Sequence, residues 1–170
     1  MPPTISGAIV GDDARAFLED AYRNSGQGDG AQLEHPLAVA RLLHDYGQRR
    51  TVLVAGLLHD VLEDTEVTAN ELQDRFGPEV TRLVEALTQD ASIPQYGERK
   101  DALRRQILDA GRDAATIALA DKVAKVEKES DQLKQRQIEH YRATLDGIEE
   151  RYGRTALGER LRAALERLPD

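Results

Sequence analysis

The chain has 170 residues, of which 31 are acidic and 23 are basic, and its formal net charge is -8. With 40% apolar and 32% charged residues, it has the composition of one ordinary domain whose core needs no disulfide or structural metal. The absence of cysteine excludes thiolate metal sites and thiol nucleophiles, and the acidic balance argues against binding to duplex nucleic acid.

The pattern of apolar residues predicts an all-α fold, because helical periodicity dominates and alternating β-branched runs are missing. The first helix is expected over residues 12–22, and a glycine-rich loop follows at residues 24–30. Pro36 suits the first turn of a second helix, which Gly47 ends. The apolar segment TVLVAGLLHDVLE, at residues 51–63, predicts one continuous central helix.

In the remainder of the chain, Thr68 and Glu71 form a capping-box pattern before a helix that ends near Gly77, and Pro78 begins another. After a loop at residues 89–97, helices are expected at residues 98–110, 113–130, 137–152 and 155–168. We therefore expect a single compact domain of about seven to nine helices over residues 1–170, closed by the helices at 137–168. No stretch approaches the roughly 20 apolar residues of a membrane span, and no leader pattern opens the chain, so a cytoplasmic protein is expected.

Four ionisable residues lie in or just after the apolar segment, namely His59, Asp60, Glu63 and Asp64. Burying one unpaired charge costs several kcal/mol, so a bound cation is the simplest compensation. On a continuous helix, a spacing of four residues puts His59 with Glu63, and Asp60 with Asp64, on shared faces. The alternative is that the helix emerges into solvent near Val61 and leaves the acids exposed.

Two further residues are candidate metal ligands. His35 precedes a helix-opening proline, and Asp121 interrupts the apolar run IALADKVAKV. With His59 and Asp60 they would supply two nitrogen and two oxygen ligands, a set that suits Mn, Fe, Zn or Ni. The second His-Asp dipeptide, at residues 44–45, lies in the last turn of its helix, where a histidine favourably faces the carbonyl ends and needs no metal.

These motifs resemble the HD-type hydrolase domain of the RelA/SpoT alarmone enzymes. The similarity covers about residues 15–150 and rests on HPLAVARLL (35–43), VAGLLHDVLEDT (54–65), VTANELQDRFGPEV (67–80) and LADK (119–122). Without a synthetase domain, the chain is most similar to the small free-standing hydrolases of the metazoan SpoT-homologue type. The resemblance implies an all-helical enzyme of the stringent response that uses Mn²⁺, or another divalent transition metal, to remove pyrophosphate from the 3′ position of ppGpp or pppGpp.

The resemblance also assigns roles to single residues. It makes His35, His59, Asp60 and Asp121 the manganese ligands, and Glu63 and Asp64 the catalytic acid pair. It implies that Arg23 packs against guanine. Tyr141 is expected to contact the ligand, with core packing as the alternative. Arg99 and Lys100, in an ERK triplet, are expected to contact phosphate, with a solvated helix face as the alternative.

The chain departs from the family around the last metal ligand. It reads ALADKVAK where the family usually reads KLADRLHN or KLADKLYN, so Ala118, Ala124 and Lys125 replace a lysine, a ring and a ligand-contacting asparagine. Lys125 could neutralise a phosphate, or pair with Glu63 or Asp64. The expected partner is therefore a guanosine polyphosphate or a related nucleotide. Another nucleotide phosphohydrolase, such as an NADPH 2′-phosphatase, and a non-catalytic alarmone sensor are the alternatives. The chain is expected to be a monomer or homodimer.

Overall fold

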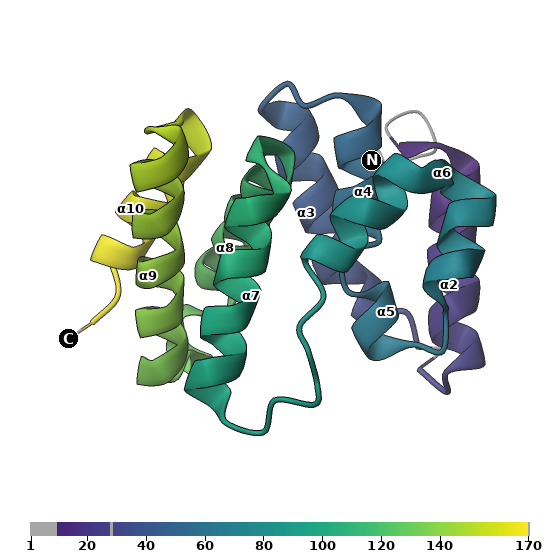
Figure 1. Ribbon diagram of the computed structural model, residues 1–170, viewed down its shortest axis with the longest axis horizontal. Coiled ribbons are helices and arrows are strands. Elements are labelled where there is room, and N and C mark those ends of the chain that lie inside the picture. The colour runs from purple at the N-terminus through teal and green to yellow at the C-terminus, as the bar shows by residue number, and fades with distance from the viewer. Residues whose placement is uncertain (1–9, 28, 170) are drawn as a thin grey trace. The chain divides into compact units, whose positions relative to one another are not determined.

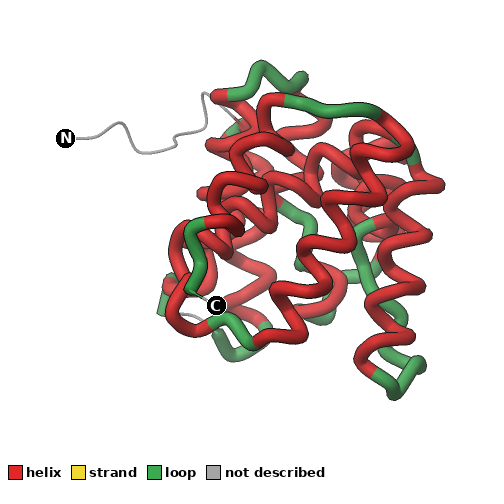
Figure 2. Tube along the Cα trace, turned by 90° about the vertical axis from the view of Figure 1, so that its left-hand side faces the viewer, coloured by secondary structure: helices red, strands yellow, loops and turns green. Residues whose placement is uncertain are grey.

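The computed structural model describes residues 10–27 and 29–169, and Figure 2 shows helices and loops but no strand among them. The predicted all-α fold is confirmed for this part of the chain. The chain divides into two compact units, Met1–Thr88 (unit 1) and Gln89–Asp170 (unit 2). The division falls at the start of the loop that the sequence predicts at residues 89–97. No helix within the described ranges has the length and apolarity needed to cross a bilayer.

Unit 1 is built around a short apolar helix. Its elements in chain order are α2 (Asp12–Asn24), the 3-10 turn η1 (Ala31–Leu33), α3 (Glu34–Asp45), α4 (Arg50–Leu57), α5 (Val61–Asp64) and α6 (Ala69–Ala86) (Figure 1). Helix α4 packs against α2, α3 and α6. Six of its eight residues are buried, as expected of a helix that is apolar on nearly every side.

A glycine sets the spacing of α3 and α4. A Cβ atom at Gly56 would collide with Cδ1 of Leu43, and it would lie 3.5 Å from Cγ1 of Val39. Leu43 and Val39 are fully buried, so the absence of a side chain at residue 56 lets the two helices approach closely.

Helix α6 contains the break that the sequence predicts. Thr68 caps it, and the capping box with Glu71 is present. Gly77 has φ 86° and ψ 171°, which lie outside the helical region, and Pro78 begins the next turns. The predicted pair of helices is therefore confirmed as one element with a sharp kink, since a positive φ costs glycine nothing.

Unit 2 contains α7 (Tyr96–Ala110), α8 (Arg112–Glu129), the 3-10 turn η2 (Ser130–Gln132), α9 (Gln135–Tyr152) and α10 (Ala156–Glu166). Helix α8 packs against each of the other three helices. It buries Ile117, Leu119 and Val123 among its apolar residues. Asp121 and Lys122 lie in the middle of this helix, so its polar residues are held on a rigid element.

Candidate functional site

The chain turns where the sequence predicts a continuous helix. Helix α4 ends at Leu57, and the four-residue α5 begins only at Val61. In between, His59 Nδ1 lies 2.7 Å from Gly56 O, and the Val61 N–H donates to Leu58 O at 3.0 Å. The prediction of one helix over residues 51–63 is therefore wrong. An apolar run cannot reveal this turn, because a buried turn and a buried helix both keep their apolar side chains in the core.

His59 and Asp60 face each other at this turn. His59 is 3% exposed. Because Gly56 O can only accept, Nδ1 carries a proton, so in the neutral tautomer Nε2 has a lone pair. Nε2 lies 3.1 Å from Asp60 Oδ2. Two lone-pair donors at this distance attract a second proton on the ring or a divalent cation, so the pair fits a metal site.

His35 adds a second imidazole to this corner of unit 1. It lies in the first turn of α3, one residue before Pro36. Its ring centroid is 5.5 Å from that of His59, with the ring planes 67° apart. The structure therefore brings three of the four predicted metal ligands together within unit 1. They come from the start of α3 and from the turn between α4 and α5.

Glu63 and Asp64 lie on α5 and are exposed. The exposure expected by the alternative is therefore present for these two acids but not for Asp60, whose side chain is 25% exposed, and the catalytic role of Glu63 and Asp64 stays a prediction. Asp64 is nevertheless held in place, since the Tyr22 hydroxyl donates to its Oδ2 at 3.0 Å. Tyr22 is 4% exposed, and burial together with the Asp64 carboxylate raises the pKa of its phenol far above the ordinary value. The phenol thus remains a donor at every physiological pH.

Arg23 follows Tyr22 in the last turn of α2. Its guanidinium is exposed and pairs with Asp20 at 2.7 Å. Both Tyr22 and Arg23 line a cavity of about 210 Å³, together with Glu19, Gln27, Asp29, Gly30 and Leu33. An arginine on the wall of an open cavity of this size suits the predicted contact with a ring.

Unit 2 places Asp121 between two lysines. Asp121 Oδ2 lies 3.7 Å from Lys122 Nζ, and its Oδ1 lies 4.0 Å from Lys125 Nζ. Lys122 is 4% exposed, and its ammonium also lies 5.4 Å from the Tyr141 ring centroid. Lys125 thus lies beside Asp121, the predicted metal ligand of its own helix.

The predicted phosphate contacts, Arg99 and Lys100, lie in a cluster of cations around the ring of Tyr96. Arg99, Lys100 and Arg136 lie 5.9, 5.6 and 4.4 Å from the ring centroid. Arg99 also donates to Ile93 O at 2.9 Å. Both predicted residues are half-buried, and their contact with phosphate stays a prediction. Sequence reasoning missed Tyr96 and Arg136, whose proximity depends on a contact between α7 and α9.

A second missed pair, Arg104 and His140, lies in the same unit. Arg104 Nη1 donates to His140 Nδ1 at 2.9 Å. Burial, followed by the nearby charges of Lys122, Lys100 and Arg104, lowers the pKa of His140 to about 3. His140 is therefore neutral at physiological pH and accepts from the guanidinium.

Tyr141 is 5% exposed. Burial raises its pKa to about 12. The ring lies against Lys122 and is tilted against His140, 5.8 Å away. Core packing, one of the two predictions for this residue, is therefore present, and the contact with ligand stays a prediction.

The family of the chain follows from its match to known domains. Residues 14–148, most of the chain, match the HD domain family. The chain belongs to this family. The match runs through both units, and it contains the His59-Asp60 dipeptide. HD domains bind divalent metals, which agrees with the facing nitrogen and oxygen donors in unit 1.

Several relatives carry the names of alarmone enzymes. The human guanosine-3′,5′-bis(diphosphate) 3′-pyrophosphohydrolase is 42% identical over 93 residues, which are 54% of this chain and 51% of that protein. The Aquifex aeolicus protein of the same name is 40% identical over 85 residues, 50% of this chain and 12% of that protein. A Myxococcus xanthus GTP pyrophosphokinase is 31% identical over 160 residues, 85% of this chain and 21% of that protein. The chain thus spans at most about half the length of these relatives.

Two solved structures have a similar fold. One is a metazoan orthologue of SpoT that hydrolyses ppGpp, with a TM-score of 0.75 and 24% identity over 91% of this chain and 94% of that one. The other is a Listeria monocytogenes protein, with a TM-score of 0.67 and 27% identity over 78% of this chain and 94% of that one. The resemblance drawn from the sequence motifs is confirmed at the level of family and fold.

Proposed function

We propose that this chain is a Mn²⁺-dependent hydrolase of the 3′-diphosphate of guanosine alarmones, converting ppGpp or pppGpp to GDP or GTP and pyrophosphate. The observation that carries the proposal is the facing pair of His59 Nε2 and Asp60 Oδ2, 3.1 Å apart beside the His35 ring, in a chain of the HD domain family. The names of the relatives support the same reaction.

In this proposal His35, His59, Asp60 and Asp121 hold the metal. The ion, when bound, would supply Lewis acidity toward phosphate oxygens and lower the pKa of a water molecule. The chain contributes the orientation of the donors. The bond from His59 Nδ1 to Gly56 O fixes the ring and its tautomer, so that Nε2 is presented as the ligand atom.

The carboxylates of α5 would transfer the proton of the attacking water. In the proposed reaction a water oxygen attacks the phosphorus bonded to O3′, the P–O3′ bond breaks, and O3′ leaves as a hydroxyl. Glu63 and Asp64 take up the proton of the attacking water and return it to the leaving oxygen. The Tyr22 hydroxyl, 3.0 Å from Asp64 Oδ2, makes Tyr22 a positioning residue for this pair.

The remaining predicted residues would bind the nucleotide. Arg23 lines an open cavity suited to packing against the guanine. Arg99, Lys100 and Lys125 supply positive charge for phosphate oxygens, and arginine in particular recognises phosphate with two parallel hydrogen bonds. Tyr141, whose buried ring lies against Lys122, would contact the nucleotide.

The test is to incubate metal-stripped protein with ppGpp, with and without Mn²⁺, and to follow GDP and pyrophosphate. Asp60→Asn should reduce turnover at least about a hundredfold, as loss of a metal ligand or its orientation does. Asp45→Asn is the matched control, since it changes the other His-Asp dipeptide, whose side chains are more than half exposed. It should leave turnover unchanged.

The same assay distinguishes the alternatives. Turnover of NADPH or another nucleotide in place of ppGpp would support the metal site and contradict the assignment of ppGpp as the substrate. Tight ppGpp binding by the Mn²⁺-loaded protein without any turnover would favour the sensor and overturn the enzyme.

A further inference from the structure

The whole net charge of the protein comes from unit 1. Residues 1–88 contain seven basic and fifteen acidic residues, whereas residues 89–170 contain sixteen of each. All seven basic residues of unit 1 are arginines. In so acidic a unit, an arginine is surrounded by more carboxylates than cations, and ion pairing is its ordinary state.

Two of these arginines differ from that ordinary state. Three others form ion pairs with carboxylates, namely Arg15 with Glu19, Arg23 with Asp20 and Arg49 with Glu79. Arg50 and Arg75 form none with any carboxylate in the described ranges 10–27 and 29–169. Both nevertheless line the same cavity of about 280 Å³. Two guanidinium groups of unit 1 therefore line one cavity without a carboxylate partner in the described residues.

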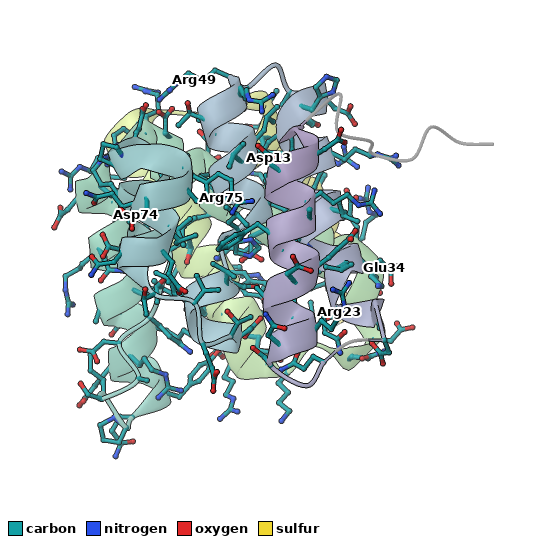
Figure 3. All side chains as sticks on the ribbon, turned by 90° about the vertical axis from the view of Figure 1, so that its right-hand side faces the viewer. Asp13, Arg23, Glu34, Arg49, Asp74 and Arg75 are labelled. Atoms are coloured by element: carbon teal, nitrogen blue, oxygen red, sulfur yellow. The ribbon has the colours of Figure 1, made fainter. Side chains whose placement is uncertain are left out.

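The lining of this cavity combines apolar and polar side chains. Val10 borders it from the segment before α2, Ala14 from the first turn of α2, Val54 from α4, and Phe76 and Val80 from α6. Thr51 and Asp13 complete the lining. In Figure 3, Arg75 reaches from α6 toward α2 on the side where Asp13 lies, near the end of α2 opposite to Arg23.

The cavity lies at the opposite end of α4 from His59 and Asp60. Arg50 and Thr51 are the first two residues of α4, whereas His59 follows its last residue, Leu57. A helix of eight residues is about 12 Å long. The cavity is therefore separate from the proposed catalytic site within unit 1, and it shares no residue with the cavity that Arg23 lines.

Arg50 and Arg75 are exposed, and each guanidinium group lies against a neighbouring residue of unit 1. A Cβ atom at Gly11 would collide with Nη2 of Arg50, so the guanidinium lies directly against the glycine backbone, where φ is 87°. The guanidinium carbon of Arg75 lies 6.0 Å from the ring centroid of Phe17. Groups held before a ligand arrives lose less entropy when they bind it.

We propose that this cavity binds a small organic dianion with an apolar body, either a phosphate monoester or a dicarboxylate. The anionic group would lie between Arg50 and Arg75, because planar guanidinium groups pair with both kinds of oxyanion through two hydrogen bonds. The apolar body would lie against Val54 and Val80. Asp13 would accept from a hydroxyl or ammonium group of the ligand. This inference does not depend on the proposed hydrolase activity.

The test uses the full chain, stripped of metal with EDTA, and two probes of equal size class, phenyl phosphate and phthalate. Saturable shifts of the Ala14, Thr51 and Val54 amide signals in proton-nitrogen NMR spectra are the expected result. Arg50→Gln and Arg75→Gln should each weaken binding at least about tenfold, as expected for loss of a charge-assisted hydrogen bond. Arg49→Gln, which removes the neighbouring paired arginine, should leave binding unchanged.

The outcomes separate the two ligand sources. Binding of phenyl phosphate alone assigns a phosphate monoester, and binding of phthalate alone assigns a dicarboxylate. Asp121→Ala should retain binding, which places the probe away from the candidate metal centre. No saturable binding at about 10 mM of either probe, equal binding of inorganic phosphate, or an equal loss in Arg49→Gln would overturn the proposal. Because Arg50 and Arg75 are both exposed, either variant keeps the test valid if the other fails to fold.

Discussion

The hydrogen bond from the Tyr22 hydroxyl to Asp64 allows a direct test of whether Tyr22 positions the Asp64 carboxylate for catalysis. Tyr22→Phe removes the donor that lies 3.0 Å from Asp64 Oδ2 and leaves the buried ring in place. Since Asp64 is exposed, water replaces the lost donor, and the free energy of unfolding should fall by only about 1 kcal/mol. The carboxylate gains rotational freedom, however. If its orientation is worth about 1 to 2 kcal/mol in the transition state, turnover should fall roughly 5- to 30-fold.

The assay is steady-state hydrolysis of ppGpp with saturating Mn²⁺. A positioning role predicts a lower kcat with KM and metal affinity unchanged. Asp64→Ala should lower kcat further, and adding Tyr22→Phe to it should have no effect, because the two residues then act as one unit. Tyr152→Phe is the matched control, since its hydroxyl donates to a backbone oxygen in unit 2. An unchanged kcat in Tyr22→Phe, or full additivity with Asp64→Ala, would refute the reasoning.

Two further predictions concern stability. His140 has a pKa of about 3 in the folded chain, below the ordinary value of about 6.5, so stability is lost as pH falls from about 6.5 toward 3. His140→Gln keeps an acceptor for Arg104 and should lessen the stability lost between pH 7.5 and 4.5 by about 2 to 3 kcal/mol in urea titrations; equal losses in both proteins would contradict the pKa. Gly56→Ala should destabilise the chain by about 1 to 3 kcal/mol and weaken Mn²⁺ binding, because the new methyl collides with Leu43. Gly97→Ala meets nothing within 4 Å and should be neutral or slightly stabilising, so equal denaturation midpoints for the two variants would show that the close approach at Gly56 is unimportant.

Most of the helices can be predicted from local signals. Glycines with positive φ, such as Gly47 and Gly111, end helices as their positions suggest. The turn at residues 58–60 could not be predicted in this way. It depends on a bond from the His59 ring to Gly56 O, and an apolar segment has the same pattern with or without such a bond.

The sequence predicts the candidate site residues better in unit 1 than in unit 2. The dipeptides at residues 44–45 and 59–60 are identical, yet His44 is 52% exposed and His59 only 4% at the side chain. The apolar context around His59 correctly distinguishes the two. In unit 2, the grouping of Tyr96 with Arg136, and of Arg104 with His140, joins residues 40 and 36 positions apart. No periodicity within one helix encodes such contacts.

The most direct test of the central claim is hydrolysis of ppGpp by the Mn²⁺-loaded protein in water enriched in oxygen-18, followed by phosphorus NMR. Attack of water on the phosphorus bonded to O3′ predicts one labelled oxygen in pyrophosphate and none in GDP. Label in the nucleotide, release of single phosphates, or no Mn²⁺-dependent turnover would contradict the assignment of His35, His59, Asp60 and Asp121 to a 3′-pyrophosphohydrolase.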